Sequence, residues 1–156
     1  MFPEDSYWHR DVSAASVHAS SAAWIDTIGR TAEFHADFGS GLWDGGPIGI
    51  PYTTVGAGQP LVPITFDYAD ESDPGPYPLP ADALIEGGSH SDGDRHVLVV
   101  DTSNCHLYEV YDAHPGPTWR AGSGAVWDLR SNARRPDGWT SADAAGLPIL
   151  PGLVRY

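Results

Sequence analysis

Side chains capable of chemistry are densest in the segment His90-Ser-Asp-Gly-Asp-Arg-His96. If this segment is extended, alternate residues point to one side, so Asp92, Asp94 and His96 present two carboxylates and an imidazole together. Carboxylates alone suit Ca²⁺, whereas an imidazole shifts the preference toward Zn²⁺, Cu²⁺ or Fe²⁺. The pattern predicts one divalent metal ion at these residues, either calcium or a transition metal. The alternative is an exposed Asp-Gly turn with a partly buried His96.

His35 and Asp37 have the spacing of a general base and the carboxylate that orients it. On one face of a strand, Asp37 would accept the imidazole N–H of His35. Such a pair can take a proton from a substrate or from water, so it is the predicted catalytic group. The alternative is a turn in which Asp37 caps the backbone.

A third group of acids, Asp67, Asp70, Glu71 and Asp73, lies in one short stretch. It offers ligands for Ca²⁺, or one member of a glycosidase pair whose carboxyl groups stand roughly 5–10 Å apart. The alternative is a solvated acidic loop.

Trp43, Trp119 and Trp139 lie in or beside Gly-rich turns, where an indole is open to the C–H face of a sugar ring. They are the predicted substrate-binding residues. Trp127 alternates with apolar neighbours in a strand pattern, so we expect it in the core.

Other reaction classes find little support in the sequence. Cys105 and His106 are neighbours that point to opposite faces of a strand, so they cannot act as a nucleophile and its base. The nucleophile-elbow pattern Gly-x-Ser-x-Gly and the glycine patterns of phosphate loops do not occur. No nucleotide cofactor is predicted.

The element that must position these groups is a β-hairpin. Residues 96–101 and 105–111 are both apolar-rich and flank Thr102-Ser-Asn104, a three-residue loop with Asn104 suited to the left-handed region. Both faces are largely apolar, so we expect a central hairpin covered on both sides. The register pairs Asp101 with Cys105, Val99 with Leu107, and Val97 with Glu109.

One helix is predicted over residues 21–29. Ser20 or Ser21 can cap it, Gly29 ends it, and its apolar residues share one face, Trp24, Ile25 and Ile28. Because the helix is short, we expect it to dock on the rest of the protein.

Further strands are predicted over residues 48–55, 61–67, 124–129 and near 149–154, the first of them at an edge because of Pro51. Residues 68–81 contain too many prolines for regular structure, and 140–146 favour a single helical turn. Short strands with Gly and Pro turns predict a mainly β fold, either a β-sandwich or a partly open barrel, with one or two short helices. We expect one domain over residues 1–156, with residues 1–18 as an extended arm.

The net negative charge of the chain argues against two classes of partner, nucleic acids and anionic membranes. The chain has 21 acidic residues against 8 basic ones and a formal net charge of −13. Nucleic acids and anionic membrane surfaces need basic stripes, so neither is a predicted partner. We expect a polysaccharide or small-molecule ligand instead.

The first ten residues lack the apolar core of a signal peptide, and we expect a secreted or extracytoplasmic protein whose leader is absent from this chain.

Three stretches together, over residues 38–52, 94–101 and 138–149, resemble an uncharacterised family of secreted bacterial proteins. The resemblance covers nearly all of the chain and carries no known activity. It implies that family members extend further at the C-terminus. A domain shortened there would expose strand edges, which a second copy in a homodimer would cover.

The leading hypothesis is a secreted polysaccharide-active protein that binds or hydrolyses a glycan, with or without a divalent metal. One alternative is a non-catalytic interaction or assembly module. Another is a metal-dependent hydrolase of small esters or phosphoesters, in which a metal-bound water is the nucleophile. Whether the protein is an enzyme is left open by the sequence.

Overall fold

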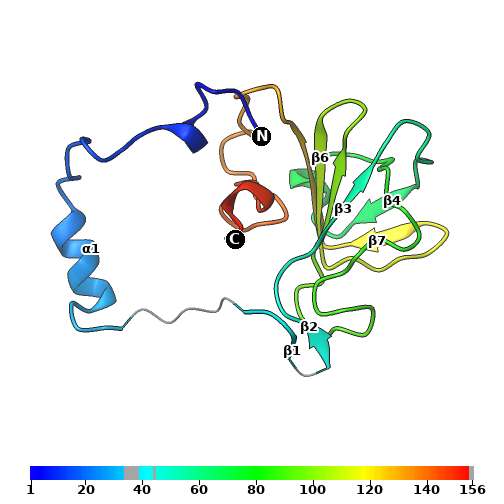
Figure 1. Ribbon diagram of the computed structural model, residues 1–156, viewed down its shortest axis with the longest axis horizontal. Coiled ribbons are helices and arrows are strands. Elements are labelled where there is room, and N and C mark those ends of the chain that lie inside the picture. The colour runs from blue at the N-terminus through cyan, green and yellow to red at the C-terminus, as the bar shows by residue number, and fades with distance from the viewer. Residues whose placement is uncertain (34–38, 44, 155–156) are drawn as a thin grey trace.

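The computed structural model describes residues 1–33, 39–43 and 45–154. The fold is mainly β, as predicted, with one α-helix and three short 3₁₀ turns (Figure 1). The strands are β1 (Leu42–Trp43), β2 (Gly46–Pro47), β3 (Tyr52–Val55), β4 (Ile64–Phe66), β5 (Val97–Asp101), β6 (His106–Tyr111), β7 (Trp119–Ala121) and β8 (Ser123–Asp128). The helices are α1 (Ser21–Ile28) and the 3₁₀ turns η1 (Tyr7–His9), η2 (Ala69–Glu71) and η3 (Leu150–Gly152).

A four-stranded sheet with the order β3-β5-β6-β8 forms the centre of the molecule. Strands β5, β6 and β8 are antiparallel neighbours, whereas β3 pairs parallel with β5 at the edge, where Pro51 predicted it. Two small sheets accompany it, a parallel β4-β7 pair and an antiparallel β1-β2 pair. The described strands form open sheets, and none of these sheets closes into a barrel.

The central hairpin forms where it was predicted, but its register is wrong by one residue. Asp101 lies opposite His106, not Cys105, so the loop has four residues, 102–105. Two side chains determine this loop: Asp101 Oδ1 accepts from the Ser103 N–H at 2.9 Å, and Asn104 Oδ1 accepts from the His106 N–H at 3.0 Å. Cys105 therefore takes the left-handed conformation predicted for Asn104, with φ of 60°.

This shift changes which residues share a face, because side chains alternate along a strand. Glu109 lies opposite Leu98, and Val99 lies opposite Tyr108, in place of the predicted pairs with Val97 and Leu107. Glu109 consequently lies on the same face of the sheet as Leu98 and Leu107.

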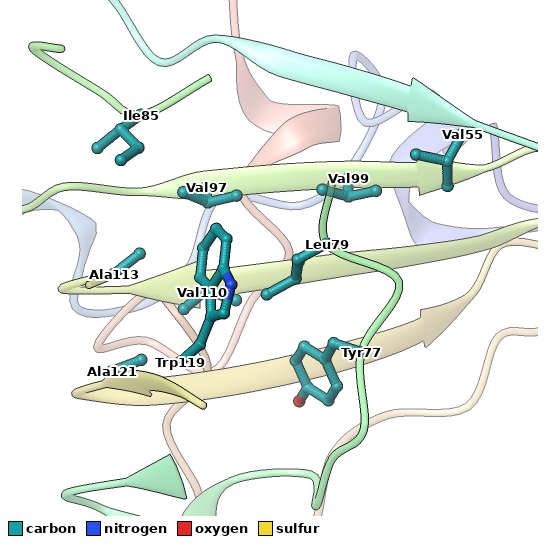
Figure 2. Packing of buried hydrophobic residues seen from close by; sticks show 10 residues of the cluster. All are labelled: Val55, Tyr77, Leu79, Ile85, Val97, Val99, Val110, Ala113, Trp119 and Ala121. Atoms are coloured by element: carbon teal, nitrogen blue, oxygen red, sulfur yellow. The ribbon is translucent and has the colours of Figure 1, made fainter. Parts of the chain in front are cut away.

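One face of the sheet carries the larger core. Val97 and Val99 of β5 and Val110 of β6 pack there against Trp119 of β7 and the buried segment 77–79 (Figure 2). The long irregular segment 68–81 therefore folds back over the sheet as a second layer, together with β4 and β7. The expectation of irregular backbone there is confirmed apart from the single turn η2.

The opposite face is covered by the end of the chain. Leu98, Leu107, Ala125 and Trp127 pack against Leu150 of η3, with Phe2 from the N-terminal arm at the margin. The hairpin is thus covered on both sides, and Trp127 belongs to the core, as predicted.

The predictions of two elements near the C-terminus are wrong. The segment 149–154 contains the 3₁₀ turn η3 in place of a strand, because Pro151 lies in its first turn and the backbone N–H groups of Ile149 and Leu150 bind a side chain. Residues 140–146 form a hydrogen-bonded turn in place of a helical turn, closed by the Gly146 N–H on the Asp143 carbonyl at 3.0 Å.

Helix α1 forms at the predicted position but does not dock. Trp24, Ile25 and Ile28, the residues of its apolar face, are 53%, 46% and 70% exposed. In Figure 1 the helix stands away from the sheets. The Trp24 ring stacks on His18, with ring centroids 4.5 Å apart. The apolar face of α1 is therefore available to another molecule.

Among the described residues, no helix has the length and apolar character that crossing a bilayer would require.

Gly124 of β8 provides a test of the close contact between the two layers. A methyl group at this position would overlap the Phe66 ring and lie 2.8 Å from the Tyr77 hydroxyl. We expect Gly124→Ala to lower the free energy of unfolding by about 1–3 kcal/mol, because the half-buried Phe66 ring must shift and Tyr77 is fully buried. Urea unfolding measures the effect.

Gly56→Ala is the matched control for this experiment. The new methyl group would lie 4.0 Å from the Thr102 hydroxyl, an ordinary contact. Equal stability of the two variants would show that the layers are not in close contact at Gly124.

Candidate functional site

A cavity of about 740 Å³ opens at one end of the central sheet. The topology explains its position, because β5 begins, β6 ends and β8 begins at the same end of an antiparallel sheet. Segments from both ends of the chain complete the walls. The lining residues are Trp8, Ile50, Tyr68, Glu71, Asp94, His96, Tyr111, Ser123, 140–144, 147–149, Gly152 and Leu153.

The loop of residues 140–148 forms one wall, and two serines fix it. Ser123 Oγ at the start of β8 donates to the Ser141 carbonyl at 2.6 Å. Ser141 Oγ lies 2.7 Å from the Leu147 carbonyl and accepts from the Asp143 N–H at 2.9 Å. Both serines are buried, so these bonds are shielded from water.

His96 is the buried polar group at the base of the cavity. Its Nδ1 lies 2.6 Å from Glu86 Oε2, and its Nε2 lies 3.0 Å from the Ala142 carbonyl oxygen. A carbonyl can only accept, and an ionised carboxylate can only accept, so both ring nitrogens carry a proton. His96 is then an imidazolium that ties β5 to the 140–148 loop.

The pKa values agree with this assignment. Burial alone would lower the pKa of His96, but the hydrogen bond and charge of Glu86 outweigh it, so the pKa is raised. Burial likewise opposes the effect of His96 on Glu86, whose pKa is nevertheless lowered. Each group therefore favours the charged form of the other.

Glu109 lies beneath the opposite wall, with its side chain inside the protein. Its carboxyl oxygens accept from the Trp127 indole N–H at 3.0 Å, the Ile149 N–H at 3.0 Å and the Leu150 N–H at 2.8 Å. Burial raises the pKa of Glu109 to about 7, and these donors oppose that rise. Glu109 thus attaches the last described segment to the middle of the sheet.

Arg135 does not line the cavity itself but contacts the backbone of two lining residues, Glu71 and Thr140. Its guanidinium forms an ion pair with Asp73, donates to the Glu71 carbonyl at 2.8 Å and lies over the rings of Trp127 and Trp139. Asp73 is therefore neutralised, whereas the Glu71 side chain lines the cavity and accepts from the Thr140 N–H at 3.0 Å. The alternative of a solvated acidic loop is wrong for Asp73, which is paired within the protein.

The predicted metal ligands are not brought together. Arg95 has a positive φ of 51°, so the segment is not extended, and Asp92 and Asp94 are exposed while His96 is buried. No group of three His, Cys, Asp or Glu side chains in residues 1–33, 39–43 and 45–154 is arranged to hold a metal ion. A metal at His96 would displace Glu86 or Ala142. The metal site stays a prediction, which metal analysis after dialysis would decide.

The other predicted residues are scattered. Trp119 is 2% exposed and belongs to the core, which contradicts the expectation of an open ring. Trp43 is 80% exposed on β1 but is not part of the cavity lining, and Trp139 is half-buried against Arg135. His35 and Asp37 lie outside the described residues.

Tyr68, Tyr111, Thr140 and Asp143 line the cavity and were not predicted as a site, whereas Glu71 was predicted as one of four candidate acids. They come from three segments that are distant in the sequence, around residues 68–71, 111 and 140–143, so no local spacing joins the set. Glu109 was the one available signal, because a glutamate inside an apolar strand requires buried partners.

No family model, curated protein or solved structure matches this chain. The resemblance to secreted bacterial proteins accordingly stays a prediction, and the function must be argued from the site.

The ion pair of His96 and Glu86 predicts how stability depends on pH. Because the pKa of His96 is raised, its contribution is present below the unfolded value of 6.5 and is lost as the pH rises through the folded value. Glu86→Gln should lower the pKa of His96, measured by NMR titration of the imidazole, and should reduce this decline. An unchanged titration would contradict the ion pair.

Asp112→Asn is the control, because Asp112 and His114 form a similar pair at 2.8 Å on the surface. Exposed pairs contribute only about 0–1 kcal/mol, so this variant should unfold almost as the parent does.

Glu109 predicts a graded loss of stability. Glu109→Leu removes the acceptor shared by the N–H groups of Trp127, Ile149 and Leu150, and we expect a loss of more than about 2 kcal/mol in urea unfolding. Glu109→Gln retains one acceptor oxygen and should lose less. A Leu variant as stable as the parent would show that these bonds contribute nothing to the fold.

Proposed function

We propose that this is a secreted saccharide-binding protein, and that its ligand occupies the cavity at the end of the central sheet. The observation that carries the proposal is the combination of rings and polar groups in one cavity. Trp8, Tyr68 and Tyr111 contribute aromatic rings, while Glu71 and Thr140 contribute polar oxygens. Aromatic faces stack on the C–H faces of sugars, and oxygens of this kind bind sugar hydroxyls.

The size of the cavity supports a ligand of one or a few sugar units. Small-molecule sites commonly enclose about 300–1,000 Å³, and this cavity has about 740 Å³. The bias of the composition toward Trp, Tyr, Asp, Gly and Pro and the resemblance to secreted bacterial proteins support secretion. Neither of these observations identifies the glycan.

We propose binding in preference to hydrolysis. The imidazole at the cavity, His96, has both nitrogens engaged by Glu86 and Ala142, so it has no free nitrogen for a proton transfer. Glycoside hydrolysis would instead depend on a pair of carboxyl groups of different protonation across the bound sugar, and the cavity acids Glu71, Asp94 and Asp143 are the residues that could supply it.

Tyr68→Ala tests the proposal, because Tyr68 lines the cavity and its side chain is 53% exposed. We expect the affinity for oligosaccharides of glucose or N-acetylglucosamine to fall by at least about fivefold, equivalent to ~1 kcal/mol of stacking. Isothermal titration calorimetry on the folded proteins measures it.

Trp43→Ala is the comparison variant, since Trp43 is an exposed ring outside the cavity lining. Its affinity should equal that of the parent. If Trp43→Ala loses binding and Tyr68→Ala retains it, the ligand binds at β1 and the cavity is not the site.

The apolar face of α1 favours a second candidate function, an assembly module. Trp24, Ile25 and Ile28 are all exposed on this face, and burying them against a second copy would stabilise a dimer. Light scattering coupled to size-exclusion chromatography would detect the dimer, and Trp24→Ala with Ile28→Ala should dissociate it. A monomeric parent protein would exclude this candidate.

A further inference from the structure

We infer that the cavity selects cationic amino sugars of the glucosamine type over N-acetylated and uronic sugars. This inference rests on the proposed saccharide binding and adds the charge class of the ligand. The inference rests on a comparison between the acids that form ion pairs within the protein and the cavity acids that do not.

Three acidic residues line the cavity from three different directions. Glu71 belongs to η2, Asp94 precedes β5, and Asp143 lies in the 140–148 loop. Asp94 is exposed and the other two are half-buried, so all three reach water or a ligand. A bound sugar would therefore meet carboxylates from three separate segments.

Neighbouring acids are neutralised within the protein, unlike these three. Asp73 pairs with Arg135, and Glu86 pairs with His96. Among the described residues, the ion pairs include none of the three cavity acids. Their charges are thus available to a ligand.

The positive charges near the cavity do not cancel the negative potential of these three acids. His96 is the cation in the lining; Glu86 is its ion-pair partner, and Asp94 attracts it as well. Arg135, which contacts the backbone of Glu71 and Thr140, is paired with Asp73. Arginine is absent from the described lining residues, and the chain contains no lysine. An ammonium group supplies both a positive charge and three N–H donors for these oxygens, whereas a uronate would meet like charges.

The Glu71 side chain also has acceptor capacity to spare. One of its oxygens accepts from the Thr140 N–H, and a carboxylate offers about four acceptor sites. Only backbone atoms of Asp143 hold its loop in place, by bonds to Ser141 and Gly146. The Glu71 and Asp143 carboxylates therefore both keep acceptor sites for a ligand.

The experiment compares tetrasaccharides of glucosamine, N-acetylglucosamine and galacturonate by calorimetry at about pH 6, where the carboxylates are ionised. We expect glucosamine to bind at least about fivefold more tightly than N-acetylglucosamine, as one extra charge pair in a solvated site provides. Galacturonate should bind most weakly. The preference should shrink as salt is added.

The double variant Asp94→Asn, Asp143→Asn should lose the preference for glucosamine while retaining its affinity for N-acetylglucosamine. The control is Asp82→Asn, Asp137→Asn, which changes the net charge equally at two exposed residues outside the cavity lining. The control should keep the preference.

The outcomes separate the two proposals. If all three sugars bind and N-acetylglucosamine or galacturonate binds as tightly as glucosamine, the charge selection is wrong and saccharide binding stands. If no sugar binds, the proposed function is wrong and the inference fails with it. Loss of the preference in the control as well would assign it to the overall charge and would overturn selection by the cavity.

Discussion

The buried carboxyl group of Glu109 is the interaction on which the cavity side of the fold depends. It lies in the middle strand of an otherwise apolar layer and accepts from the Trp127 indole, Ile149 and Leu150. Burying a carboxyl group is costly unless its oxygens are satisfied, and here a single residue satisfies three donors that would otherwise be orphaned. Because two donors belong to the end of the described chain, the same contact covers the apolar face of the sheet and sets one wall of the cavity.

Two further ion pairs hold segments of the chain around the cavity, and both are built in the same way. His96 with Glu86 joins β5 to the 140–148 loop, and Arg135 with Asp73 joins the segment before β7 to the region after β8. In each case a cation that has little exposure meets a carboxylate and also donates to a backbone carbonyl. Long loops without regular structure can be held by such contacts, because each one satisfies backbone groups that no strand pairs. The cavity accordingly results from the ion pairs and hydrogen bonds that attach these loops to the end of the sheet.

The sequence predicted the elements well and their connections poorly. Two apolar-rich runs flanking a short turn identified the hairpin, and proline and glycine marked the irregular segments. The register failed by one residue, because the Asp101 and Asn104 side chains close the loop by their own hydrogen bonds, which strand patterning does not encode. Trp119 was misplaced for a related reason: glycine-rich surroundings predict an open turn, but tertiary packing of β7 against Val97 buries the ring. Asp94, His96 and Glu71 were candidate site residues and line the cavity, but the cavity itself could not be predicted, since its residues come from segments that meet only in the folded protein.

The arrangement separates the groups that hold the fold from those that could hold a ligand. Glu109 and His96 are buried and have their hydrogen bonds satisfied within the protein. Asp94 and Tyr68, in contrast, expose their side chains in the same cavity. Substitutions at exposed positions without buried partners usually change stability little, whereas removal of a buried partner leaves a desolvated group unsatisfied. Ligand preference in this cavity can therefore change by substitution of its exposed acids and rings while the buried carboxyl and imidazole keep the walls in place.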